Sequence, residues 1–114
     1  MSEMQRPPGK TTIAPDVLET IARLTTLSVP GVSRMAPVNR LFKKENTEGV
    51  SIVVENNGVY ADLYVILGRD VNAREVSHTI QTQVSRAISE MVGMEVGKIN
   101  VHVEDIDYST SMGK

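Results

Sequence analysis

The first periodic segment of the chain has the apolar spacing of an amphipathic helix. It begins at Pro15, because proline is favoured in a first helical turn, where its missing amide hydrogen is not needed. Pro30 disfavours helical geometry in the residue before it, so the helix should end by Val29. The residues expected to follow the core-facing spacing are Val17, Leu18, Ile21, Ala22, Leu24, Leu27 and Ser28.

Apolar and polar residues alternate over residues 50–55 and again over residues 59–67. Between the two runs lies Asn56-Asn57-Gly58. Because Asn and Gly tolerate positive φ, this tripeptide is a strong signal for a tight turn. The two alternating runs therefore predict a β-hairpin.

A long helix and a last strand should follow the hairpin. Asn72 and Glu75 have the spacing of a capping box, and Gly93 is a natural C-terminal cap. The apolar stripe of this helix consists of Val76, Ile80, Val84, Ile88 and Met91. Residues 98–106 alternate again, which predicts the last strand.

These elements predict an α+β fold in the order helix, strand, strand, helix, strand, with room for a short strand at Thr11–Ile13 in front. The helix between two strands implies a parallel pair, whereas the hairpin is antiparallel, so the three- to four-stranded sheet should be mixed. Both helices should cover one face of the sheet, as a two-layer sandwich. We expect one domain at residues 12–107, flexible tails at 1–11 and 108–114, and a mobile loop at 32–49.

Composition narrows the classes of function. The chain has no cysteine, which excludes a disulfide scaffold and a thiolate metal site. No run approaches the roughly 18 apolar residues of a membrane span, and the first residues lack a signal peptide, so we expect a cytoplasmic protein. A net charge of −2 disfavours nucleic acid as a partner.

One face of the predicted sheet should stay open if the helices cover the other. The open face carries more aromatic and apolar side chains than solubility requires, and tyrosine is a favoured contact residue. Its members form the candidate interaction surface: Val53, Tyr60, Asp62, Tyr64, Ile66 and His102. The alternatives are that these residues only satisfy strand propensity on a half-exposed sheet, or that they form a ligand platform.

No residue pattern indicates catalysis. The sequence holds no nucleophile motif, so we predict no enzyme and no catalytic, cofactor-binding or metal-binding residue. His102 and Glu104 share a strand face, but so sparse a pair is more typical of a solvated strand than of a metal site. A basic loop could contact phosphate or anionic lipid, although such clusters are usually solvated; it contains Arg34, Arg40, Lys43 and Lys44.

Three segments in order resemble the alkaline shock protein (Asp/Gls-type) envelope stress response family. They are TIAPDVLETIARLTTLSVPGV for the opening helix and its turn, EGVSIVVENNGVYADLYVILG for the central hairpin, and VNAREVSHTIQTQVSRAISEMVGMEVGKINVHVEDI for the closing helix and strand. Together they cover Thr12 to Ile106. Ala14 departs from the pattern, since the family often has a Ser-like helix cap there, and a missing cap costs about 1 kcal/mol.

The resemblance implies a non-catalytic structural or scaffold protein of bacterial cell-envelope homeostasis. Some members of the family self-assemble, and some reach the membrane through a separate membrane-anchored partner. We therefore expect a homo-oligomer that is cytoplasmic and becomes membrane-proximal through such a partner. The alternative is a KH-like RNA-binding module, because the order of elements overlaps, although the sequence lacks a GxxG loop and a basic stripe.

Overall fold

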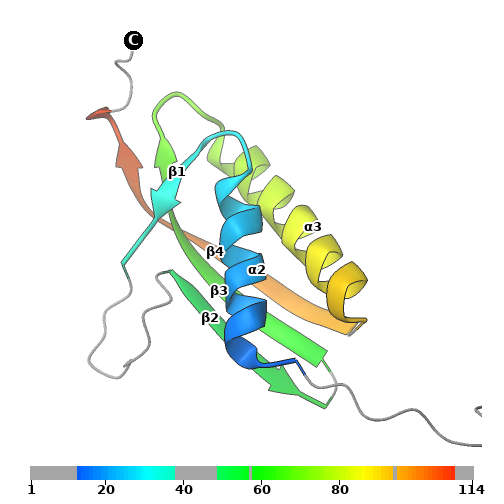
Figure 1. Cartoon of the computed structure of the whole chain (residues 1–114). Helices are drawn as coiled ribbons and strands as arrows, with labels where there is room; N and C mark the ends of the chain where they lie inside the picture. Colours follow the sequence, from blue (N-terminus) through cyan, green and yellow to red (C-terminus); the bar gives the residue numbers. More distant parts are fainter. Residues whose placement is uncertain (1–12, 38–48, 57, 94, 110–114) are drawn as a thin grey trace, which may run out of the picture.

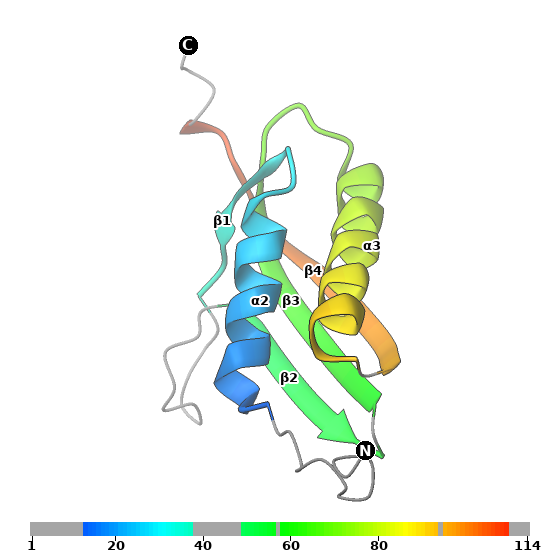
Figure 2. The same cartoon turned by 45° about the vertical axis from the view of Figure 1, so that its right-hand side comes forward.

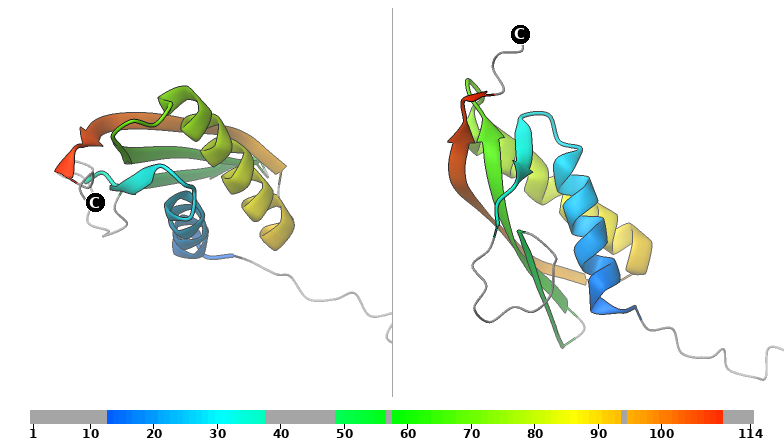
Figure 3. Two further views of the ribbon diagram at one scale, coloured as in Figure 1. Left: turned by 90° about the horizontal axis from the view of Figure 1, so that it is seen from above. Right: turned by 60° about the vertical axis from the view of Figure 1, so that its left-hand side comes forward.

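A computed structural model of the chain describes residues 13–37, 49–56, 58–93 and 95–109. Its elements are, in chain order, α2 (Pro15–Leu27), β1 (Val32–Met35), β2 (Val50–Glu55), β3 (Gly58–Gly68), α3 (Ala73–Val92) and β4 (Glu95–Asp107). The two helices lie on one face of a four-stranded sheet, which confirms the predicted α+β sandwich (Figure 1). Among the described residues, no helix or strand covers the opposite face (Figure 3).

Strand β3 is the centre of the sheet. Residues Gly58–Leu63 of β3 pair antiparallel with β2, and residues Val65–Leu67 pair antiparallel with β1. On the opposite edge, β4 pairs parallel with β3 from Gly58 to Gly68. The sheet is therefore mixed, as the sequence predicts.

The hairpin forms where the sequence places it. Glu55 pairs with Gly58, which leaves a two-residue turn, and Asn56 has a φ of 49°. Strands β1 and β2 meet on the same edge of β3 at Tyr64. The amide nitrogen of Tyr64 donates to the Gly49 carbonyl at 2.8 Å, and its carbonyl accepts from Ala36 at 2.8 Å.

A fourth strand follows the first helix. Strand β1 occupies residues that the sequence analysis assigned to a mobile loop, so that prediction is wrong for Val32–Met35. A four-residue strand is too short for a clear alternation, and its pairing with β3 defines it. In front of α2, Ile13 belongs to neither helix nor strand, and Thr11 lies outside the described residues, as does most of the predicted loop.

The helix ends also follow the sequence signals. Helix α2 begins at Pro15, and Ala14 before it makes no side-chain capping bond. Helix α3 begins after Asn72, whose side-chain oxygen accepts from the Glu75 amide at 3.0 Å. It ends at Gly93, which has a φ of 70°. Figure 2 shows the two helices side by side on the same side of the sheet.

Aliphatic side chains form the core between the two layers. The central strand contributes every second residue, and α3 contributes the stripe that the sequence predicts. The buried core cluster comprises Leu18, Ala22, Val29, Met35, Val50, Val59, Ala61, Leu63, Val65, Leu67, Val76, Ile80, Val84, Ile88 and Ile99. Met91 is the exception on α3, because it lies near the end of the helix and is 67% exposed.

Helix α2 is rotated relative to the predicted stripe. Val17 and Leu24 were expected in the core but are 46% and 55% exposed. Thr26, which lies outside the predicted stripe, is fully buried, as is Ala22, which belongs to it. Thr26 tolerates burial because its hydroxyl donates to the Ala22 carbonyl at 2.7 Å, so no polar group is left unsatisfied.

Candidate functional site

The register of the strands defines the face of the sheet that the helices leave uncovered, here called the outer face. Val53 of β2 lies opposite Tyr60 of β3, and on the other side Tyr64 lies beside His102 of β4. The structure thus brings most of the predicted interaction surface onto one face. By register the outer face comprises Arg34, Ser51, Val53, Glu55, Tyr60, Asp62, Tyr64, Ile66, Lys98, Asn100, His102, Asp105 and Asp107, and Glu104 lies in the irregularity between Val103 and Asp105.

At the centre of the outer face, two aromatic rings stack on each other, and one of them contacts a carboxylate. The rings of Tyr64 and His102 stack with their centroids 4.5 Å apart and their planes 13° apart. His102 Nε2 lies 2.9 Å from Asp62 Oδ1, and Asn100 Nδ2 donates to the same oxygen at 3.1 Å. Because a carboxylate oxygen only accepts, this geometry assigns the proton to His102 Nε2. The contacts hold both rings in a defined orientation.

The same cluster leaves acceptor atoms open. Within the described part of the chain, no hydrogen bond reaches Asp62 Oδ2, His102 Nδ1 or the Tyr64 hydroxyl. Burial raises the pKa of Tyr64, and the nearby carboxylates of Asp62 and then Glu104 raise it further. Glu104 follows His102 by two residues on β4. We call Asp62, Tyr64, His102 and Glu104 the acceptor cluster.

Val53 and Tyr60 form an apolar part of the outer face beside the acceptor cluster. They are 47% and 42% exposed, respectively, and lie directly opposite each other. The ring of Tyr60 covers Gly97 of β4, since a Cβ at that position would lie 2.6 Å from Tyr60 Cζ. The glycine thus allows the ring to lie against the sheet.

Ile66 was predicted to be part of the exposed interaction surface, but it is buried. It belongs to the outer face by register, but it is only 6% exposed. Arg34 lies opposite it on β1 and Asp105 lies beside it on β4. The aliphatic stem of an arginine can cover an apolar neighbour while its charged end stays in water, so alternation alone overstated the exposure of this residue.

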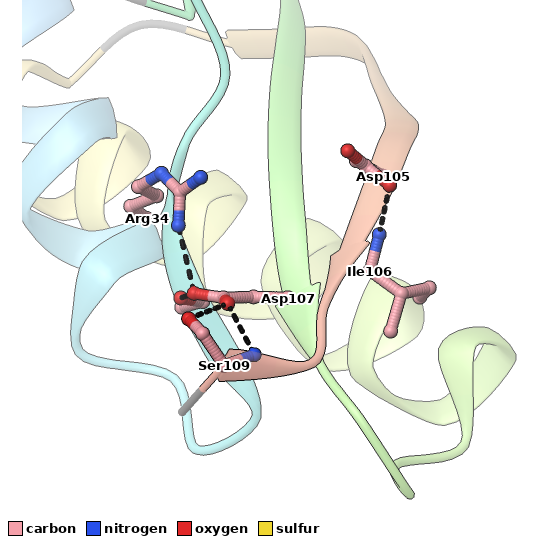
Figure 4. Close-up of polar contacts among 6 residues, drawn as sticks. Arg34, Asp105, Ile106, Asp107 and Ser109 are labelled. Carbon is pink, nitrogen blue, oxygen red and sulfur yellow. Dashed lines mark hydrogen bonds and ion pairs between the residues drawn. The ribbon is translucent and has the colours of Figure 1, made fainter. Parts of the chain in front are cut away.

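The end of β4 carries a carboxylate, Asp107, that is bonded within the fold. Asp107 Oδ2 accepts from Ser33 Oγ and from Arg34 Nη1, both at 2.7 Å. Its Oδ1 accepts from Ser109 Oγ at 2.6 Å and from the Ser109 amide at 3.0 Å (Figure 4). Asp107 pairs with Gly68 of β3, and its carboxylate bonds Ser33 and Arg34 of β1 on the far side of that strand.

These hydrogen bonds lower the pKa of Asp107 to about 2, although burial opposes the shift. The bond from Ser109 Oγ has the largest effect, and the bond from Ser33 comes next. The sequence held a signal for half of this arrangement. An aspartate whose side chain accepts from the amide two residues later is an Asx-turn, and Asp107 with Ser109 has that spacing. The other half joins residues far apart in the chain and has no local signal.

Of the four residues of the predicted basic loop, the described part of the chain contains only Arg34. Arg34 lies in β1 and binds Asp107, so it is not part of a loop. The other members of that prediction, Arg40, Lys43 and Lys44, lie outside the described residues.

The remaining candidates for chemistry are sparse. His78 is exposed on α3, where it lines a groove of about 450 Å³ together with Arg74, Glu75 and Thr79. Within the described ranges, no group of His, Asp and Glu side chains could hold a metal ion. No helix in those ranges is both long and apolar enough to span a bilayer.

Comparison with known proteins shows the family of this chain. The model of the alkaline shock protein 23 family, described by its cell envelope-related function, matches residues 3–108. The uncharacterized protein YqhY of Bacillus subtilis is 28% identical over 90% of this chain and 80% of its own length. The uncharacterized protein Spy1535 of Streptococcus pyogenes is 34% identical over 86% of this chain and 79% of its own length.

Solved structures support the fold at a lower sequence identity. The copper form of the MamM CTD superposes with a TM-score of 0.61, covering 88% of this chain and 90% of that one. The two sequences are only 14% identical, so the similarity concerns the fold alone.

Proposed function

Because the chain belongs to the alkaline shock protein 23 family, with its cell envelope-related function, we propose that it is a non-catalytic scaffold of the cell envelope. It acts in the cytoplasm through association with copies of itself and with a membrane-anchored protein. Such a role needs an accessible contact surface, and the outer face supplies one.

The observation that carries this proposal is the uncovered face of the sheet. Tyr60 and Val53 are both more than two-fifths exposed there, beside the stacked rings of Tyr64 and His102. Tyrosine and histidine bury a large area with few rotatable bonds, and tyrosine is enriched at the energetic centres of protein interfaces. A rigid aromatic patch on a flat sheet is suited to protein contacts.

The chemistry of the described residues gives less support to the other classes of function. Asp107 has a strongly lowered pKa, which can mark a catalytic group. Its carboxylate oxygens, however, accept hydrogen bonds from Ser33, Arg34 and Ser109 inside the fold. RNA binding would need a basic stripe. The outer face instead carries the acids Glu55, Asp62, Glu104 and Asp105 against Lys98. The other cation on this face, Arg34, is paired with Asp107.

Light scattering over a range of protein concentrations tests self-association. We expect the mass to grow with concentration for the wild type and the growth to be abolished in Tyr64→Glu, which adds a charge at the centre of the outer face. Met91→Glu is the matched control, because it adds the same charge at an exposed apolar residue in the helical layer. Growth that survives Tyr64→Glu would move the contact to a strand edge, and a monomer at every concentration would reject self-association.

Co-sedimentation with membranes tests the second contact. The protein should sediment with native membranes and lose this property after the membranes are stripped of proteins by protease. Binding that survives protease treatment would indicate a direct contact with lipid and would contradict a protein partner.

A further inference from the structure

We propose that the acceptor cluster binds an arginine side chain from a basic segment of the membrane-anchored partner. This inference rests on the proposed function and names the chemistry of the partner at the outer face. It follows from three properties of the cluster: its hydrogen-bonding atoms, its aromatic rings and its charge.

The first property is the type of atom left open. Asp62 Oδ2, His102 Nδ1 and the Glu104 carboxylate accept hydrogen bonds, because the only ring proton that the geometry requires is on His102 Nε2, which points to Asp62 Oδ1. A ligand that complements these atoms must donate. Guanidinium offers five N–H donors and no acceptor, so its hydrogen-bonding inventory is the complement of this cluster.

The second property is the aromatic pair. Tyr64 stacks on His102 with an interplanar angle of 13°, and the backbone pairing of β3 with β4 places the two residues side by side. A guanidinium is planar and stacks on aromatic faces as well as binding carboxylates. A lysine could satisfy the charge but not the stacking, which is why arginine is the expected residue.

The third property is the charge of the surrounding surface. Asp62 and Glu104 raise the pKa of Tyr64, and Glu55 and Asp105 add two more carboxylates to the outer face. The cations on this face are Lys98 and Arg34, and Arg34 is paired with Asp107. Cytoplasmic segments next to a membrane span carry an excess of Lys and Arg. An acidic face attracts such a basic segment. The anionic lipids of the cytoplasmic leaflet repel the acidic face itself.

The test uses the full chain and a short Gly/Ser peptide that carries arginines, with the same peptide carrying citrulline as control. Citrulline keeps the size of arginine and removes its charge. Two-dimensional NMR should show peptide-dependent shifts at Tyr64 and His102 for the arginine peptide, and binding should weaken as salt rises. Shifts of equal size with the citrulline peptide would overturn the inference, because charge would then not be recognised.

Variants separate the cluster from the general charge of the protein. Asp62→Asn keeps an oxygen for His102 Nε2 and removes the charge, and Glu104→Gln does the same at the second carboxylate. Each should weaken peptide binding about two- to fivefold. Glu90→Gln on α3 is the matched control, since it removes the same charge from an exposed position in the other layer and should leave the affinity unchanged. Equal weakening in all three variants would overturn the inference.

Two further outcomes distinguish this inference from the proposed function. Membrane recruitment that is lost in Tyr64→Glu, without any binding of the arginine peptide, would retain the scaffold and overturn the arginine site. Binding to vesicles of anionic lipid without binding to the peptide would also overturn it. Peptide binding that is lost in Tyr64→Ala but kept in Tyr64→Phe would support it, because the ring and not the hydroxyl carries the stacking.

Discussion

Asp62 and Asp107 both project from the side of the sheet that the helices leave uncovered, and both accept more than one hydrogen bond. Their surroundings differ. The Asp62 side chain is 39% exposed and uses one oxygen for both of its bonds, to Asn100 and His102. The Asp107 side chain is 8% exposed, and both of its oxygens accept bonds from within the fold.

The difference shows how the same residue type can serve the fold in one place and a ligand in another. A carboxylate whose acceptors are all used inside the protein has nothing left to offer a partner, so Asp107 joins strands β1 and β4. A carboxylate with an open oxygen beside exposed rings keeps part of its binding capacity. The two aspartates have the same residue type and charge. They differ in whether all of their carboxylate oxygens already accept hydrogen bonds within the protein.

The largest expected effect comes from removing the saturated carboxylate. Asp107→Ala leaves Ser33, Arg34 and Ser109 without their shared acceptor, and we expect the melting temperature to fall by roughly 5 to 10 °C. Asp105→Ala is the control, because its exposed side chain bonds only the adjacent Ile106 amide among the described residues. Thermal unfolding followed by circular dichroism measures both, and equal losses would show that Asp107 has no special part in joining the strands.

The pH dependence of stability sharpens the same point. The pKa of Asp107 falls from an ordinary 3.8 to about 2 in the folded protein, so the folded state favours the ionised form. Its stabilising effect should be complete above about pH 4 and should disappear as the pH falls through about 2. We therefore expect the difference in melting temperature between the wild type and Asp107→Asn to shrink steadily over this range. A constant difference would contradict the assigned pKa.

The next effect concerns the apolar part of the outer face. In Gly97→Ala, the new methyl group would meet the ring of Tyr60, which must then swing away from the sheet. Because Tyr60 is 42% exposed and can move, we expect the free energy of unfolding to fall by only about 1 kcal/mol. In a Tyr60→Ala background the same change should cost less, and chemical denaturation of the four proteins measures the coupling. Additive effects would show that the ring and the glycine do not depend on each other.

The sequence was sufficient for the elements that have strong local signals. Asn56-Asn57-Gly58, the Asn72 cap and Gly93 each specify a local backbone geometry, and the structure confirms all three features. The rotation of α2 could not be read in this way. Val17 and Leu24 have core-like spacing, but they are exposed and Thr26 is buried, and that choice depends on the surfaces against which α2 packs.

The candidate surface shows the same division between local and long-range information. Alternation along the hairpin placed Tyr60, Asp62 and Tyr64 on one face, and the register confirms that placement. The stacking of Tyr64 on His102 depends on the parallel pairing of β3 with β4, whose exact register includes two irregularities. The burial of Ile66 by its neighbours on β1 and β4 likewise arises only when the strands are assembled.

A smaller effect on stability is expected at the open carboxylate. Asp62→Asn keeps an acceptor for His102 Nε2 on an exposed part of the sheet, so the free energy of unfolding should change by no more than about 0.5 kcal/mol. Asp107→Asn should cost clearly more under the same conditions, because the lost charge is bound by Arg34 and by two serines. Urea unfolding of the two variants at neutral pH makes the comparison, and similar losses would refute the division between a structural and an open carboxylate.

The smallest effect is the ionisation of Tyr64. Burial and the carboxylates of Asp62 and Glu104 raise its pKa, so the folded protein disfavours the tyrosinate. The stabilisation is therefore present below the ordinary pKa of tyrosine, about 10, and is lost as the pH rises through the higher value of the folded state. In a Tyr60→Phe/Tyr108→Phe background, the absorbance of tyrosinate should report Tyr64 alone, since the chain has 3 tyrosines. Adding Asp62→Asn and Glu104→Gln should shift that titration to lower pH, while Glu90→Gln should leave it in place. An unchanged titration would show that the two carboxylates do not act on the ring, and the charge argument for an arginine at this site would fail with it.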